Sequence, residues 1–169
     1  MFKPRYKLTN KILKNLTDIA EAKGIIEKAK LLPKHELKLK RQAIIRMSHS
    51  STAIEGNILD IRQVEALQAG KKINAPARDI YEVQNYLETL KYIDKIVKGK
   101  KEISGKVLLK IHSAVTNRTL PKEQSGHYRR GPVYIVRRRL GFSDQVVYTA
   151  PVAESVSGFC TDLIKWDCR

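Results

Sequence analysis

The sequence is poor in the residues that mark secreted and membrane proteins. Its 169 residues include only two cysteines, Cys160 and Cys168, which form neither a disulfide framework nor a zinc-binding pattern. It has no run of about 18 apolar residues that could cross a membrane. No apolar segment follows the basic residues 1–7, as a secretory signal requires. We therefore expect a cytoplasmic protein with neither a membrane segment nor a metal site.

Acidic residues are scarce relative to basic ones, and the positive charge is uneven along the chain. The 33 lysines and arginines against 17 aspartates and glutamates give a net charge of +16. The net charge is +9 over residues 1–46, zero over residues 47–99 and +7 over residues 100–169. Such a surface attracts phosphates, so nucleic-acid binding is one alternative and a solvated, lysine-rich surface is the other. Nucleic acid is not favoured, because aromatic residues make up only 7% and no zinc-finger or aromatic-basic RNA-binding pattern occurs.

Apolar residues recur three and four positions apart along most of the chain, which is typical of amphipathic helices. Thr9 or Asn10 caps the first helix, whose apolar face we expect to be buried and which we expect to break at Gly24. Asn85 and His112 lie on later helices, and we interpret both as structural residues. Capping and terminating residues delimit the further predicted helices, at residues 37–55, 61–69, 78–97, 104–115 and 151–166.

Two short segments interrupt the helical pattern with β-branched and aromatic residues, Val133–Val136 and Val146–Thr149. Residues 141–144 between them are typical of a turn. The predicted fold class is therefore mainly α with one β-hairpin. Because an isolated hairpin is marginally stable in water, it must pack on the helices or on a ligand.

The most informative stretch is Ser51–Asn57, at the end of the helix predicted for residues 37–55. Gly56 suits the left-handed conformation that closes a helix, which places Glu55 in the last helical turn. A carboxylate there faces the negative end of the helix dipole, which costs up to about 1 kcal/mol. A broken local rule of this kind often marks a functional site. A solvated glutamate that tolerates the small cost is the alternative interpretation.

Ser51-x-x-x-Glu55-Gly56 resembles the inhibitory-helix motif of Fic-domain proteins, in which Ser or Thr is followed after three residues by Glu and then by Gly or Asn. The resemblance implies a Fic-type helical bundle, with a helical N-terminal domain at residues 1–100 and the first part of the Fic core, including its flap hairpin, at residues 101–169. Further segments resemble the family in its own order, so that the resemblance covers nearly the whole chain: Tyr6-Lys7-Leu8-Thr9, Glu82-Val83-x-Asn85-Tyr86, Leu108-Leu109-x-Ile111-His112, Gly126-x-Tyr128-Arg129, Tyr148-x-Ala150-Pro151 and Leu163-Ile164-Lys165-Trp166.

One departure from the family is large. The catalytic signature, which begins His-Pro-Phe and continues with an acidic residue, Gly-Asn and two arginines, does not occur in the sequence. In the family this loop transfers AMP from ATP, with Mg²⁺, to a Ser, Thr or Tyr hydroxyl of a target protein. The resemblance therefore implies no catalytic residue here and no AMP transfer by this chain alone. ATP and Mg²⁺ are expected as cofactors of the complete family member only, and the chain resembles a truncated, frameshifted or shortened form.

The resemblance assigns three residues to inhibition. Glu55 would pair with the last arginine of the signature, which otherwise holds the γ-phosphate of ATP, because an arginine binds a carboxylate or a phosphate with the same pair of donors. Ser51 would anchor the helix, and Gly56 would let the backbone turn close to the nucleotide.

The resemblance assigns the hairpin to the flap that aligns the target. Strand core is the alternative interpretation for its two apolar residues, and a solvated turn for Arg137–Arg139. The residues that match the flap positions near the adenine and the target are Ile135, Val136, Arg137 and Arg138.

Three functions follow from these observations. The first is the N-terminal part of a Fic-type protein adenylyltransferase, with a target protein as its partner. The second is a regulator, similar to the separate antitoxins of the family, that inserts Glu55 into another Fic protein. Self-association of the chain is a further possible partnership. The third is a basic nucleic-acid-binding protein.

Overall fold

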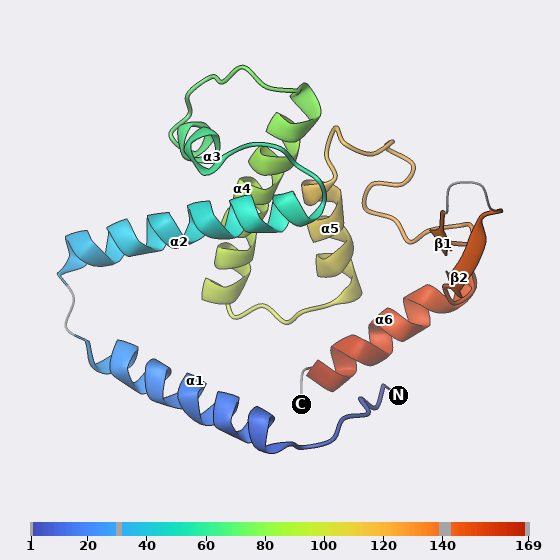
Figure 1. Cartoon of the computed structure of the whole chain (residues 1–169), viewed down its shortest axis with the longest axis horizontal. Helices are drawn as coiled ribbons and strands as arrows, with labels where there is room; N and C mark the ends of the chain where they lie inside the picture. Colours follow the sequence, from blue (N-terminus) through green and yellow to red (C-terminus); the bar gives the residue numbers. More distant parts are fainter. Residues whose placement is uncertain (1, 30–31, 139–142, 168–169) are drawn as a thin grey trace. The chain divides into compact units, whose positions relative to one another are not determined.

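The computed structural model describes residues 2–29, 32–138 and 143–167, and it is mainly helical with one two-stranded antiparallel sheet (Figure 1). This confirms the predicted fold class. The elements in chain order are α1 (Asn10–Lys28), α2 (Pro33–Ile54), α3 (Ile61–Gln68), α4 (Ala77–Lys98), α5 (Gly105–Val115), β1 (Tyr134–Arg137), β2 (Gln145–Thr149) and α6 (Ala153–Asp167).

The chain divides into two compact units. One is Lys3–Ile44, and the other comprises Met1–Phe2 and Ile45–Arg169. The boundary falls inside α2, so the last part of this helix belongs to the larger unit. The boundary predicted at residue 100 concerns family domains rather than compact units and stays a prediction.

The first helix differs from its prediction in two ways. Thr9 caps it as expected, since its Oγ1 accepts the N–H of Ile12 at 3.3 Å. The helix runs through Gly24 without a break, because a glycine inside a helix costs only about 1 kcal/mol. The expectation of a buried apolar face is wrong: α1 buries none of its residues, and Ile19 is 63% exposed. The amphipathic pattern formed the helix, but none of the described residues of its own unit buries the apolar face.

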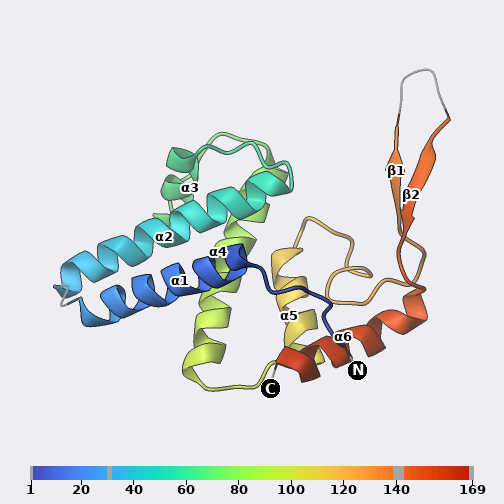
Figure 2. The same ribbon diagram turned by 60° about the horizontal axis from the view of Figure 1, so that its bottom comes forward.

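The core of the larger unit is built around α4. Helix α3 packs on α4, α4 packs on α5, and α5 contacts α6 (Figure 2). Caps predicted from the sequence are present, including the reciprocal capping box of Asp60 and Gln63 and the Ser104 cap of α5. The buried apolar residues of this core are Ile45, Leu59, Val64, Leu67, Val83, Leu87 and Ile96.

The hairpin contributes nothing to that core. Its strands pair Tyr134 with Thr149 and Arg137 with Gln145, and a bulge shifts the register between Ile135 and Val136. Every residue of both strands is exposed. The predicted hairpin is confirmed with ends shifted by one residue, whereas the interpretation of its apolar residues as strand core is wrong for the part of the chain that the structure describes.

Candidate functional site

The turn after α2 closes the helix with a pair of backbone hydrogen bonds. Gly56 has φ +89°, the left-handed conformation that glycine adopts without strain. Its N–H donates to the Ala53 carbonyl at 3.0 Å, and the N–H of Asn57 donates to the Thr52 carbonyl at 3.1 Å. This is the pattern of a Schellman motif, and it confirms Gly56 as the closing glycine. Glu55 is the residue just before it.

The start of this turn is held by side chains. The hydroxyl groups of Ser51 and Tyr86 form a hydrogen bond of 2.9 Å between α2 and α4. Thr52 is buried, and its Oγ1 donates to the Ser48 carbonyl at 2.9 Å. The side chain of Ser51 therefore ties the end of α2 to α4, and its role in inhibition stays a prediction.

The end of the turn is held by Asn57, whose side chain is buried. Its Nδ2 donates to the carbonyl of Asp79 and to a carboxylate oxygen of Glu82, both at 3.0 Å, and its Oδ1 accepts the N–H of Leu59 at 3.1 Å. Glu82 also accepts from the Nε of Arg78 at 2.9 Å. Sequence reasoning did not predict these contacts. The signal was the spacing of Asp79, Glu82 and Tyr86, which lie on one face of a helix.

Glu55 itself is exposed, and among the residues that the structure describes its carboxylate has no hydrogen-bond or ion-pair partner. No heavy atom outside its chain neighbours lies within 4 Å of a Cβ built on Gly56. The tip of the turn is therefore open, while Ser51 and Asn57 on either side of it are tied to α4. A carboxylate in this setting is available to a cation that the described residues do not supply.

A second set of contacts runs from α4 to the loop before the hairpin. Asn85 is buried and its Nδ2 donates to the carbonyls of Val115, the last residue of α5, and of Asn117 just after it. The Nδ1 of His112 accepts the N–H of Gly126 at 3.0 Å. These contacts confirm the structural interpretation of both side chains. They also connect the two predicted sites through α4 and α5.

Gly126 requires the absence of a side chain. Its φ is +74°, and a Cβ built on it would lie 2.9 Å from the Cβ of Ser113. The glycine therefore lets the loop cross α5 at close range. This is a structural reason for the first residue of the Gly126-x-Tyr128-Arg129 segment.

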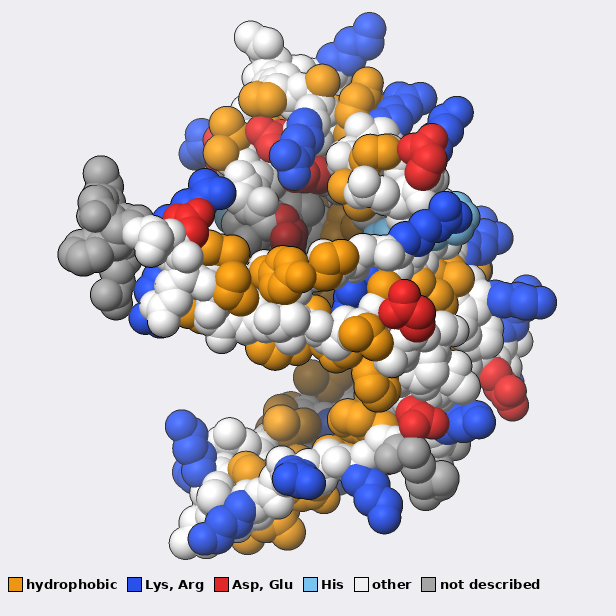
Figure 3. Space-filling view, turned by 90° about the vertical axis from the view of Figure 1, so that its right-hand side faces the viewer, with side chains coloured by type: hydrophobic (Ala, Val, Ile, Leu, Met, Phe, Trp, Pro, Cys, Tyr) orange, Lys and Arg blue, Asp and Glu red, His pale blue; other side chains and the backbone are white. Residues whose placement is uncertain are grey.

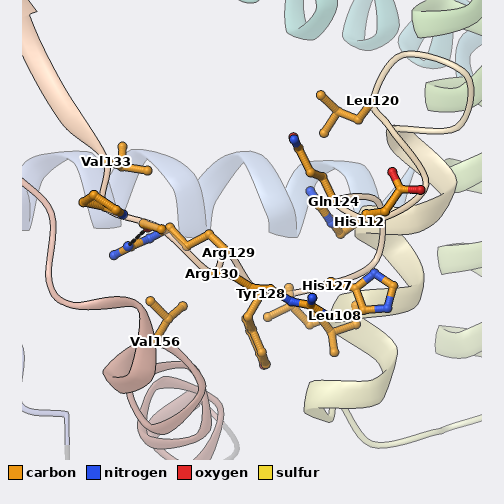
Figure 4. Close-up of a pocket in the computed structure, with 14 residues that line it drawn as sticks. Leu108, His112, Leu120, Gln124, His127, Tyr128, Arg129, Arg130, Val133 and Val156 are labelled. Atoms are coloured by element: carbon orange, nitrogen blue, oxygen red, sulfur yellow. Dashed lines mark hydrogen bonds between the residues drawn. The ribbon is translucent and has the colours of Figure 1, made fainter.

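Arg129 closes the base of the hairpin. Its Nη1 donates to the Gly131 carbonyl at 2.7 Å and its Nη2 donates to the Pro151 carbonyl, so that it joins the entry and the exit of the hairpin. Figure 4 shows Arg129 between Val133 and Tyr128.

Burial and the neighbouring Cys160 thiol raise the pKa of the Tyr128 phenol above its ordinary value, so this group stays protonated at neutral pH.

The predicted flap residues lie together on one arm of the hairpin. Ile135, Val136 and Arg137 are in β1, and Arg138 follows directly. All are exposed, with Ile135 at 57%. Arg138 forms an ion pair of 3.5 Å with Asp144, and both side chains are exposed, so the pair is weak. Arg139 and the predicted turn residues 141 and 142 lie outside the described residues.

A pocket of about 730 Å³ lies between α5, the loop of residues 120–133 and α6 (Figure 4). Leu108, Leu120 and Val156 form apolar parts of its wall, and His112 and Arg130 are also at its surface. None of the residues assigned to inhibition or to the flap lines it. No group of three or more metal-ligating side chains is found in the described part of the chain, here or elsewhere.

The fold and the open turn define a helical module that carries a projecting hairpin. No protein-family model and no curated protein matches the sequence. The structure is similar to the crystal structure of a Fic family protein from Desulfovibrio desulfuricans G20, with a TM-score of 0.75 and 29% sequence identity. The match covers 98% of this chain and 47% of the solved chain, so this chain spans about half the length of that protein.

This similarity confirms the resemblance to the Fic family: nearly the whole chain has a Fic-type fold. The flap and inhibitory roles of individual residues remain predictions. No helix within the described ranges is long and apolar enough to cross a membrane.

Proposed function

We propose that this chain is the regulatory and target-binding part of a Fic-type protein adenylyltransferase, with Glu55 as its inhibitory residue. The observation that carries the proposal is the open Schellman turn: an unpartnered carboxylate at Glu55, with anchored residues on both sides, in a chain with a Fic-type fold.

The chemistry of the inhibition is competition for an arginine. A guanidinium group binds a carboxylate or a phosphate through two parallel hydrogen bonds, so one arginine cannot hold both. The Glu55 carboxylate would bind the last arginine of the signature, and ATP would then be held in an unproductive position.

The residues that the structure describes do not suit a Mg²⁺–ATP site, because no three or more His, Cys, Asp or Glu side chains gather among them. The family's ligands belong to the signature that this sequence lacks. The chain therefore contributes the inhibitor and the flap, and the nucleotide-binding groups come from a signature-bearing segment.

The hairpin would bind the target by strand addition. A two-stranded sheet has unpaired N–H and C=O groups along its outer edges, which can pair with an extended segment of another protein. The exposed Ile135 and Val136 offer apolar contacts, and Arg137 and Arg138 favour an acidic target segment.

The regulator that acts on another Fic protein is the second candidate, and the exposed, unpartnered Glu55 favours it equally. Nucleic-acid binding is supported by the net charge alone. Figure 3 shows lysine and arginine side chains scattered among apolar ones on the face it views, rather than gathered in one stripe.

The test joins residues 1–167 to a signature-bearing segment of a Fic protein and measures the transfer of labelled AMP from ATP to protein. The unjoined chain should acquire no label. In the joined protein Glu55→Gln should raise labelling at least tenfold, because hydrogen bonds to a charged group contribute about 1.5–3 kcal/mol each. Glu65→Gln is the matched control, since Glu65 is an exposed glutamate on α3. Equal activity in the two variants would refute the role of Glu55.

The same variants separate the two candidates. If the chain acts on another protein, the unjoined chain should reduce AMP transfer by a separate Fic protein, and Glu55→Gln should abolish that effect. Inhibition that persists in Glu55→Gln would contradict the second candidate.

A further inference from the structure

We infer that α4 is the support that aims the inhibitory carboxylate, and that Tyr86 and Glu82 are positioning residues acting through Ser51 and Asn57. This inference rests on the proposed function of Glu55. It adds two residues on a different helix, and it identifies a place from which inhibition can be tuned without changing Glu55.

The bond between Ser51 and Tyr86 controls the rotation of the end of α2. Ser51 lies in the last turn of α2, and Glu55 is the first residue after that helix ends at Ile54. The Ser51 hydroxyl is 2.9 Å from the Tyr86 hydroxyl, which is 35 residues further along the chain. A bond at Ser51 therefore fixes the direction in which the next turn presents Glu55.

The contacts of Asn57 control the other side of the turn. Glu82 lies one helical turn before Tyr86, so both bonds reach the same face of α4. Asn57 is only 8% exposed, and Glu82 accepts from it and from Arg78 at the same time. The bond from Asn57 to the Glu82 carboxylate is charge-assisted, which makes it the stronger of the two attachments.

Together the two attachments limit the motion of a segment that would otherwise be mobile. Helix ends open more easily than helix centres, and Gly56 adds backbone freedom to this one. Without the bonds to α4, the Glu55 carboxylate would sample many positions and would meet its arginine less often. The strength of inhibition is therefore set by the geometry of α4 as well as by the charge of Glu55.

The first test uses the chain as it is and measures amide hydrogen exchange at residues 55, 56 and 57, whose N–H groups are bonded within the turn. Tyr86→Phe removes only the hydroxyl and should accelerate their exchange about two- to twelvefold, the factor that corresponds to one neutral hydrogen bond. The matched control is Tyr92→Phe on the same helix, whose ring lies 4.9 Å from the Lys110 ammonium group, a contact that phenylalanine keeps.

Ser51→Ala should have the same effect as Tyr86→Phe, and the double variant should be no faster than either single variant, since all three lack the same bond. Unchanged exchange in Tyr86→Phe would overturn the inference. So would effects of the two substitutions that multiply in the double variant.

The second test uses the joined, signature-bearing protein. Tyr86→Phe should raise AMP transfer several-fold when Glu55 is present and should have no effect in the Glu55→Gln background. A purely structural role would change activity equally in both backgrounds and would overturn the inference. If Glu55→Gln alone changes nothing, the proposed function fails, and the exchange measurement still decides whether α4 holds the turn.

Discussion

Asn57→Asp is a nearly isosteric change that tests the stronger of the two attachments of the turn that carries Glu55. The Asn57 amide donates at 3.0 Å to the Asp79 carbonyl and at 3.0 Å to the Glu82 carboxylate. An ionised carboxyl group in its place cannot donate, and it puts an oxygen opposite two acceptors. The variant therefore replaces two attractive contacts by two repulsive ones without a change of shape.

The size of the effect follows from the bonds that are lost. A neutral hydrogen bond contributes about 0.5–1.5 kcal/mol and a bond to a charged group about 1.5–3 kcal/mol, so the loss of both lowers the free energy of unfolding by about 2–4.5 kcal/mol. Repulsion from Glu82 adds to this, and Arg78 at 2.9 Å reduces it. We expect a loss of about 3 kcal/mol at neutral pH.

The loss should shrink in acid. When the introduced carboxyl group is protonated it can donate to Glu82 again, so its pKa in the folded variant lies above the unfolded value of about 3.9. The stability contributed by this proton is fully present below the unfolded pKa and disappears as the pH rises through the folded pKa. The variant should therefore be closer to the parent chain at about pH 4 than at about pH 7.

Urea unfolding followed by circular dichroism, at both pH values, measures this difference. Asn74→Asp is the matched control, because Asn74 is exposed in the loop before α4, and it should change stability by less than about 0.5 kcal/mol. A deficit in Asn57→Asp that is the same at both pH values would refute the shared-proton reasoning. A deficit below about 1 kcal/mol would refute the attachment itself.

Two further predictions concern the hairpin and the loop before it. Gly126→Ala should lower the free energy of unfolding by about 2–5 kcal/mol, because of the left-handed conformation and the 2.9 Å approach to Ser113. The control Gly131→Ala, whose added Cβ meets nothing within 4 Å, should change it by less than about 1 kcal/mol. Similar free energies of unfolding for the two variants, measured in urea, would contradict the close approach. Amide exchange should be slowest in α4, which buries five of its residues, and fast in β1 and β2, whose residues are all exposed. Equally slow exchange in the hairpin would show that it is covered in solution.

The local features of the fold could be predicted because each depends on neighbouring residues. The helix of residues 78–97 was evident from its periodicity, and the structure has it as α4, Ala77–Lys98. The capping box at Asp60 and the left-handed Gly56 depend on side chains and backbone preferences within a few residues. For the same reason the motif Ser51-x-x-x-Glu55-Gly56 could be recognised and placed at a helix end.

Burial could not be predicted from periodicity. The apolar positions of α1 show a helical spacing, yet Leu16 is 55% exposed. The apolar residues of the hairpin are the β-branched and aromatic types that strands favour, yet all of them are exposed. An amphipathic pattern indicates that a face can be buried, and only the tertiary arrangement determines whether a segment covers it.

The sequence by itself determined the helices, the hairpin, the absence of the catalytic signature and the position of Glu55 at a helix end. Only the tertiary structure decided what holds that glutamate in place. The bond from Ser51 to Tyr86 spans 35 residues, and the bond from Asn57 to Glu82 spans 25. Contacts between residues this far apart depend on how two helices pack, and neither propensity nor spacing within one helix specifies them.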